Sequence, residues 1–294
     1  MTTSSLDPVH LNSIGIFPLL EESEEDFIKR AEKILTAAKK SENEDLIVEG
    51  LSYTLPSSER LSTEKQNLYS DKVKELYGFR ANWVPAYFLN KGLPLLTGGM
   101  AVQFKKEENE DWMTFFQLKN VFKNKKKWFI YTAAEIVSHE MCHVARSNLN
   151  SIRYEESLAY QTSESGFRRI IGGALLKPSD NILFLLTILW MLICNLFFRN
   201  SAFFFTGLDI LPLITVLFLG LYRNFSIRKE LSICKSKFYE FFGDEYQQVL
   251  FRLSDDEISE IVKIDLQNLP EWWVKIPSFR GDLMRRIYKI KDVI

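Results

Sequence analysis

The chain has 294 residues, which is enough for one large domain or two small ones. Apolar residues make up 46% and charged residues 26%, so a hydrophobic core is expected and general disorder is excluded. Lysine and arginine number 37 against 38 acidic residues, and this balance argues against a whole-chain nucleic-acid binder. The three cysteines are odd in number and widely spaced, so they do not indicate a disulfide framework.

The N-terminal region has the pattern of a mixed domain of helices and strands. Ser23, with Asp26 three residues later, predicts a helix start, and the helix should reach about Lys40. Further elements are expected in this order: a helix over 63–77, strands at 83–89, 98–104 and 112–118, and helices over 128–146 and 154–171. The stretch 112–118 is the last strand before the helix over 128–146. We expect it to be either the sheet edge that binds an extended peptide or an ordinary core strand.

The helix over 128–146 carries the strongest chemical signal, His139-Glu140-Met141-Cys142-His143. Residues four apart project from one face of a helix, so both imidazoles can hold a single zinc ion while Glu140 lies beside it as a general base. Cys142 should point away from the metal and pack in the core. Glu135, one turn before His139, could orient that histidine, although a solvated position is the simpler expectation.

A catalytic zinc site needs a third protein ligand and a position open to water. Glu156, on the next expected helix, is the preferred third ligand. Glu155 is the alternative, but it faces about 100° away on the same helix. His10 is the remaining histidine, and it lies in a polar N-terminal segment without fixed geometry.

The motif HExxH followed on the next helix by Glu156-Ser157-Leu158-Ala159 resembles the gluzincin superfamily of zinc metallopeptidases. The resemblance covers residues 128–172 and implies that Glu156 is a metal ligand and that the small Ala159 allows close helix packing. Membrane-bound members of that superfamily carry an aspartate after the alanine, whereas this chain has Tyr160. The tyrosine lies one turn after Glu156, and we expect it to contact a ligand histidine or to donate to the oxyanion.

Two apolar runs follow, at residues 182–198 and 202–222, and each approaches the roughly 20 residues that cross a bilayer. We therefore expect a two-helix transmembrane hairpin. Basic residues predict its orientation, with the connecting turn outside and both termini in the cytoplasm. Eight of them flank the hairpin, against Arg199 alone in the turn: Arg168, Arg169, Lys177, Arg223, Arg228, Lys229, Lys235 and Lys237.

Three regions are expected from these patterns. Residues 1–178 should form a cytoplasmic zinc metallopeptidase domain, 179–222 the transmembrane hairpin, and 223–294 a cytoplasmic helical region that packs on the catalytic domain. Within the last region, helices are expected over about 223–250, after Ser254 with its partner Glu257, and from Ser278. The fold class is therefore α+β: a mainly helical, zincin-like domain with a small sheet, followed by the hairpin and a helical C-terminal region.

The expected function is that of a membrane-anchored zinc endopeptidase with Zn²⁺ as cofactor, in which Glu140 assists attack of a zinc-bound water on the peptide bond. Candidate donors to the oxyanion are Tyr154, Tyr160, Arg280 and Arg285. Expected partners are a peptide or membrane-associated protein substrate and the lipid bilayer, without nucleic acid. The alternative is a hairpin-anchored interaction or regulatory protein whose zinc site is structural or vestigial.

Overall fold

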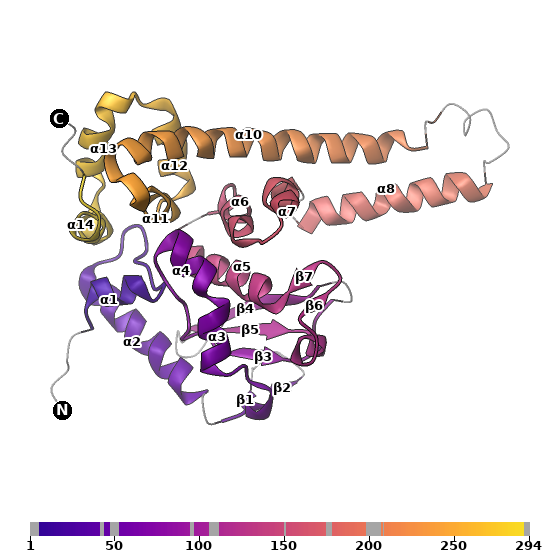
Figure 1. Ribbon diagram of the computed structural model, residues 1–294, viewed down its shortest axis with the longest axis horizontal. Coiled ribbons are helices and arrows are strands. Elements are labelled where there is room, and N and C mark those ends of the chain that lie inside the picture. The colour runs from indigo at the N-terminus through magenta and orange to yellow at the C-terminus, as the bar shows by residue number, and fades with distance from the viewer. Residues whose placement is uncertain are drawn as a thin grey trace.

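The zinc-motif helix α5 lies against a three-stranded sheet in the computed structural model of the chain (Figure 1). The described residues are 6–41, 44–47, 53–94, 97–105, 112–149, 151–174, 178–197, 207 and 209–290. Their helices, with α8 and α10 forming a long hairpin, are α1 Pro8–Ser13, α2 Glu24–Lys40, α3 Thr63–Tyr69, α4 Asp71–Tyr77, α5 Ala133–Arg146, α6 Glu155–Ala159, α7 Gly166–Ile171, α8 Pro178–Phe197, α10 Leu211–Phe242, α11 Tyr246–Phe251, α12 Asp255–Lys263, α13 Leu269–Lys275 and α14 Ser278–Ile287.

The main sheet has the strand order β3-β5-β4. Its strands are β3 Ala86–Phe88, β4 Gly99–Lys105 and β5 Trp112–Leu118. β3 runs parallel and β4 antiparallel to β5, so β5 is the central strand and has no free edge. The prediction that residues 112–118 form the peptide-binding edge is therefore wrong. The edge strand beside α5 is β4. β5 lies in the middle because it also pairs with β3, a distant segment of the chain, and local pattern does not encode such a pairing.

Two short hairpins complete the strands: β1 Leu46–Ile47 with β2 Thr54–Leu55, and β6 Lys127–Trp128 with β7 Tyr131–Thr132. The second hairpin occupies the start of the helix predicted over 128–146, so α5 begins at Ala133 instead. The helix predicted over 154–171 is also interrupted, since α6 ends at Ala159 and α7 begins at Gly166 after the Ser165 cap. The helix starts predicted at Ser23 and Ser254 are confirmed, each with the serine side chain accepting a backbone N–H.

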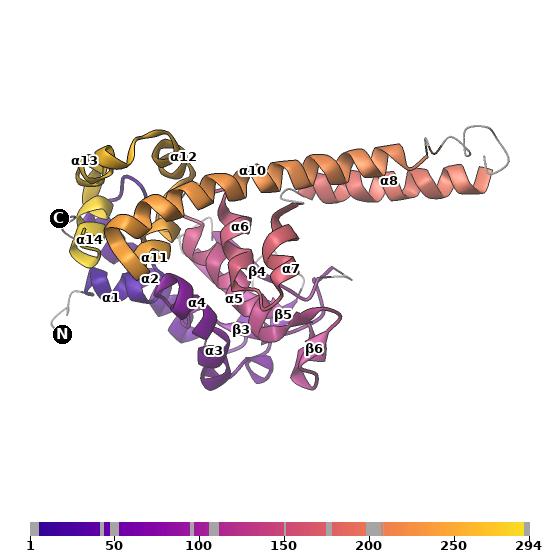
Figure 2. The ribbon, with the colours of Figure 1, turned by 45° about the horizontal axis from the view of Figure 1, so that its top comes forward.

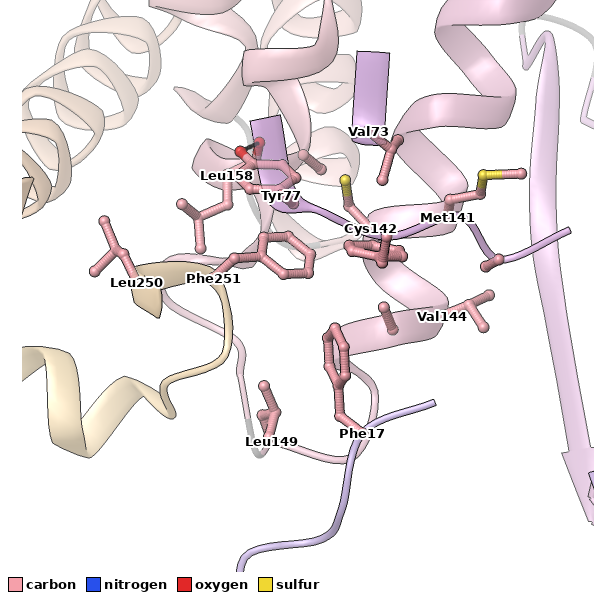
Figure 3. Close-up of a cluster of buried hydrophobic side chains, with 14 of the residues drawn as sticks. Phe17, Val73, Tyr77, Met141, Cys142, Val144, Leu149, Leu158, Leu250 and Phe251 are labelled. Carbon is pink, nitrogen blue, oxygen red and sulfur yellow. Dashed lines mark hydrogen bonds between the residues drawn. The ribbon is translucent and has the colours of Figure 1, made fainter. Parts of the chain in front are cut away.

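One hydrophobic core joins the N-terminal and C-terminal halves of the chain. Phe251 on α11 stacks on Tyr77 on α4, with ring centroids 4.1 Å apart, and its ring also meets Phe17 (Figure 3). The buried face of α5 contributes Met141 and Cys142 to the same core. The helix that carries the zinc motif is thus packed against C-terminal residues.

α8 and α10 run side by side and project beyond the rest of the molecule in both ribbon views (Figures 1 and 2). Among the described residues, no helix is both long enough and apolar enough to cross a membrane. The uncharged part of α8, residues 182–197, is about 16 residues or roughly 24 Å long. In α10 only about 12 residues precede Arg223, against the roughly 30 Å of a bilayer core.

The prediction of a transmembrane hairpin is therefore wrong. The predicted localisation, an integral membrane protein with two spans and cytoplasmic termini, is wrong for the same reason. The helices include only part of the apolar runs counted in the sequence, because α8 ends at Phe197 and α10 starts only at Leu211. Arg199 of the predicted turn, Lys177, and residues 202–206 and 208 of the second predicted span lie outside the described residues.

Candidate metal centre

The helix α5 is built to present its two histidines on one face. A capping box starts it, in which Thr132 accepts the backbone N–H of Glu135 and Glu135 accepts that of Thr132. His139 and His143 follow four residues apart, so their imidazoles project one above the other. Residues on the opposite side of the helix are buried in the core, which fixes its rotation.

Three side chains converge in front of this face. The Nε2 atoms of His139 and His143 are 3.0 Å apart, and each lies 3.4 Å from a carboxylate oxygen of Glu156. Donor atoms about 2.1 Å from a tetrahedral zinc ion are about 3.4 Å from one another, so this spacing fits such an ion. The three side chains keep 19–28% of their surface exposed, which leaves a side accessible to water.

The carboxylate of Glu156 supplies the negative charge that suits a cation. Burial raises the pKa of Glu156, but its hydrogen bond to His139 and the charges of both histidines lower it below its usual value. The carboxylate is therefore ionised near neutral pH. Glu156 is the acid that sequence analysis preferred as third ligand, and it belongs to the one group of three such donors among the described residues.

Glu155 takes a different position. Its Oε1 lies 2.7 Å from Nδ1 of His143, on the side of the ring that faces away from Glu156. An Nδ1–H donated to this carboxylate leaves the lone pair of Nε2 directed at the shared point, as metal-bound histidines require. Burial lowers the pKa of His143, but the hydrogen bond to Glu155 and the charges of Glu140, Glu156 and Glu155 raise it to about 9.

Glu140 lies between the motif helix and the sheet edge. Its Oε2 accepts the backbone N–H of Ala101 on β4 at 2.8 Å. This amide points away from β5, because Phe116, which is paired with Ala101, donates its own N–H to Pro85 on the β3 side. The carboxylate predicted to be the general base therefore stands at the free edge of the sheet, beside the metal-ligating face of α5.

Tyr160 packs on one of the histidines. Its ring centroid is 4.6 Å from that of His139, at an interplanar angle of 65°. On its other side is Gly172, where a Cβ atom would come within 2.2 Å of the ring, so only glycine fits this close approach. Burial and the charge of Glu156 raise the pKa of Tyr160, and the phenol stays protonated as a hydrogen-bond donor.

The short helix α6, which carries Glu155 and Glu156, is held by contacts to α4 and α10. Tyr77 on α4 donates its hydroxyl to the carbonyl of Leu158 at 2.6 Å. Tyr154, at the start of α6, donates to Glu230 on α10, and Arg153 pairs with the same carboxylate at 2.6 Å. A five-residue helix is marginal by itself, so these contacts determine where Glu156 lies.

The loop before α6 is fixed by Asp255, which also pairs with the buried Arg146. Arg146, at the end of α5, is fully buried and lies 3.7 Å from Asp255 on α12. Asp255 also accepts the backbone N–H groups of Ile152 and Arg153 at 2.7 and 2.6 Å. The C-terminal region thereby sets the path of the chain between α5 and α6, which carry the candidate ligands.

Other predicted site residues lie elsewhere. Tyr154 is bound to Glu230, Arg280 to Glu257, and Arg285 to carbonyl groups at the end of α13, so none of these three predicted donors reaches the metal centre. Cys142 is buried, as expected, and burial raises the pKa of its thiol well above the usual value. Glu135 is buried rather than solvated, and it pairs with Arg168 rather than orienting His139. His10 lies on α1, outside the ligand group.

Sequence reasoning missed two features of the site, the bond of Glu155 to His143 and the role of β4 as the edge strand. A doubled glutamate at the third-ligand position was the available signal for the first, and nothing local signalled the second. No protein-family model, curated protein or solved structure matches this chain. The function proposed below therefore depends on the chemistry of these side chains.

Proposed function

We propose that the chain is a zinc-dependent metalloendopeptidase of the gluzincin type. The observation that carries the proposal is the convergence of both Nε2 atoms and the Glu156 carboxylate at 3.0–3.4 Å. A structural zinc site is closed by four protein ligands, whereas a catalytic site has three and an open position. The partial exposure of all three side chains supports the catalytic alternative over a structural one.

A zinc ion bound there would supply an activated water and polarise the peptide carbonyl. Glu140 is placed to take the proton of the attacking water and to pass it to the leaving amine, because its carboxylate lies next to the ligand face and does not belong to the ligand group. Tyr160, protonated and packed on His139, is the best-placed donor for the oxyanion among the four considered.

The substrate would be an extended peptide segment added to β4. Residues 99, 101 and 103 alternate with the residues that bond to β5, so their backbone groups face the open side. Ala101, opposite Glu140, lies within the strand rather than at its end, since β4 continues to Lys105. A bound peptide would therefore extend past the reacting bond in both directions, which favours internal cleavage over trimming of chain ends.

The test is a pair of variants assayed for metal content and for hydrolysis of quenched fluorescent peptides. Glu140→Gln should retain about one zinc per chain and lose turnover by at least ~10²-fold, because only the proton transfer is removed. His143→Ala should lose the metal and with it the activity. Peptide cleavage that survives in Glu140→Gln, or that resists a zinc chelator, would contradict the proposal.

A further inference from the structure

The projecting hairpin exposes an unusual amount of apolar surface. Eighteen large apolar side chains among the described residues of 182–225 are at least 39% exposed: Ile182, Leu183, Leu185, Leu186, Leu189, Trp190, Leu192, Ile193, Leu196 and Phe197 on α8, and Ile210, Leu211, Ile214, Leu217, Phe218, Leu219, Tyr222 and Phe225 at or on α10. A large apolar side chain corresponds to on the order of 100 Å² of buried area, so this set presents on the order of 1,000 Å². The largest apolar patch of a typical monomer is about 300–600 Å².

These side chains point in more directions than one protein partner can cover. On α8, Thr187 and Cys194 are buried seven residues apart, on one stripe of the helix. Trp190 and Leu192 are 43% and 57% exposed and project about 160° apart at 100° per residue. A protein surface would cover one of these sides, whereas lipid acyl chains adapt to all of them.

A second apolar cluster lies at the base of the hairpin. Phe129 and Ile130, in the turn between β6 and β7, are 74% and 59% exposed, and Phe167 on α7 is 70% exposed. Arg168 joins the two segments by donating to the carbonyl of Ile130. Asn224 on α10 donates to the carbonyl of Ile170 on α7 at 2.6 Å, so α7 borders the base of the hairpin.

The turn exposes an aromatic ring on a strained backbone. Phe129 has φ of 50°, a backbone conformation that favours glycine or asparagine and is strained for a bulky residue. Its ring contacts that of Trp128, with centroids 4.7 Å apart, and most of it remains exposed. Basic side chains accompany the cluster: Lys125, Lys126 and Lys127 are exposed immediately before it, and Lys229 is exposed on α10.

We propose that this combined surface binds an anionic lipid bilayer. The hairpin side chains and Phe129 with Ile130 would enter the apolar phase, and the lysines would meet the headgroups, as interfacial segments with apolar and basic residues do. Neither helix needs to cross the bilayer for this. The proposal does not depend on peptidase activity, because it concerns binding alone.

The test is flotation of the full chain with phosphatidylcholine vesicles, with and without about a third of phosphatidylserine. We expect flotation with both, and stronger, salt-sensitive flotation with phosphatidylserine. Leu185→Ser with Leu189→Ser and Leu192→Ser should lower the bound fraction at least tenfold. Lys125→Glu with Lys126→Glu should remove only the dependence on phosphatidylserine.

The matched control is Ile47→Ser with Leu68→Ser and Val274→Ser, three apolar side chains that are 65–74% exposed away from the hairpin. It should float like the wild type, and the circular dichroism melting curve of each variant shows whether it is folded. The proposal is overturned if the wild type fails to float, or if the control binds as weakly as the hairpin variant. It is also overturned if the lipid-free wild type is a stable dimer that the hairpin variant dissociates and that ignores vesicles.

Discussion

Replacing Glu155 tests whether this side chain orients His143 for metal binding. Its carboxylate accepts the Nδ1–H at 2.7 Å, and only 19% of its side chain is exposed. Loss of such a partner lowers metal affinity by about 10–100-fold, or roughly 1.4–2.7 kcal/mol. Glu155→Gln keeps a carbonyl acceptor and should lower zinc affinity about tenfold. Glu155→Ala removes the acceptor and should lower zinc affinity by close to a hundredfold.

The assay is zinc competition against a fluorescent chelator at one fixed pH, with Glu164→Gln, an exposed glutamate nearby, as the control. The graded order of wild type, Glu155→Gln and Glu155→Ala is the expected result. Equal zinc affinity in all three, together with loss of zinc in His143→Ala, would refute the positioning role while leaving the metal site itself in place. Absence of zinc binding by the wild type would instead reject the metal site.

Three further predictions concern the site and its surroundings. Asp255→Ala leaves the fully buried Arg146 without its anionic partner and should lower the free energy of unfolding, measured by urea denaturation, by about 3–5 kcal/mol. Asp256→Ala, at an exposed neighbouring position, is the control and should have little effect. Similar losses in the two variants would contradict the ion pair between Arg146 and Asp255. The pKa of His143 is about 9, so zinc has to displace a proton at neutral pH, and zinc affinity should rise about tenfold per pH unit up to about pH 9. In the metal-free protein the same raised pKa stabilises the fold below pH 6.5, and this contribution is lost as the pH rises through about 9, which pH-dependent melting would detect.

Local pattern was sufficient to select three side chains that lie close together, the candidate metal ligands. The spacing of His139 and His143 needs only a helix, and Glu156 could be preferred over Glu155 from helical geometry. The surroundings of these ligands were not predictable in the same way. Tyr77 and Glu230, which hold α6, are distant from it in the sequence, and their contacts exist only after the two halves of the chain share a core.

The errors in the predicted fold have physical causes of the same kind. Apolar content suggested two membrane spans, but the point at which a helix starts decides how much of an apolar run it includes, and α10 starts late. The β6–β7 hairpin replaced the expected beginning of the motif helix, because Thr132 caps α5 at a point where hydrophobic periodicity alone indicated no break. Strand order could not be predicted from local pattern, since β5 pairs on both sides with segments that precede it.

α10 is a single helix of 32 residues, about 48 Å long. Glu230 lies about 28 Å from the outer end of α10. It accepts a hydrogen bond from Tyr154, which immediately precedes the helix that carries Glu156. Because α10 is one continuous helix, binding of a partner at its outer end is mechanically coupled to the carboxylate that would bind the metal. Thermodynamic reciprocity then applies: if anchoring the outer end tightens the hold on zinc, loading zinc strengthens the anchoring by the same free energy.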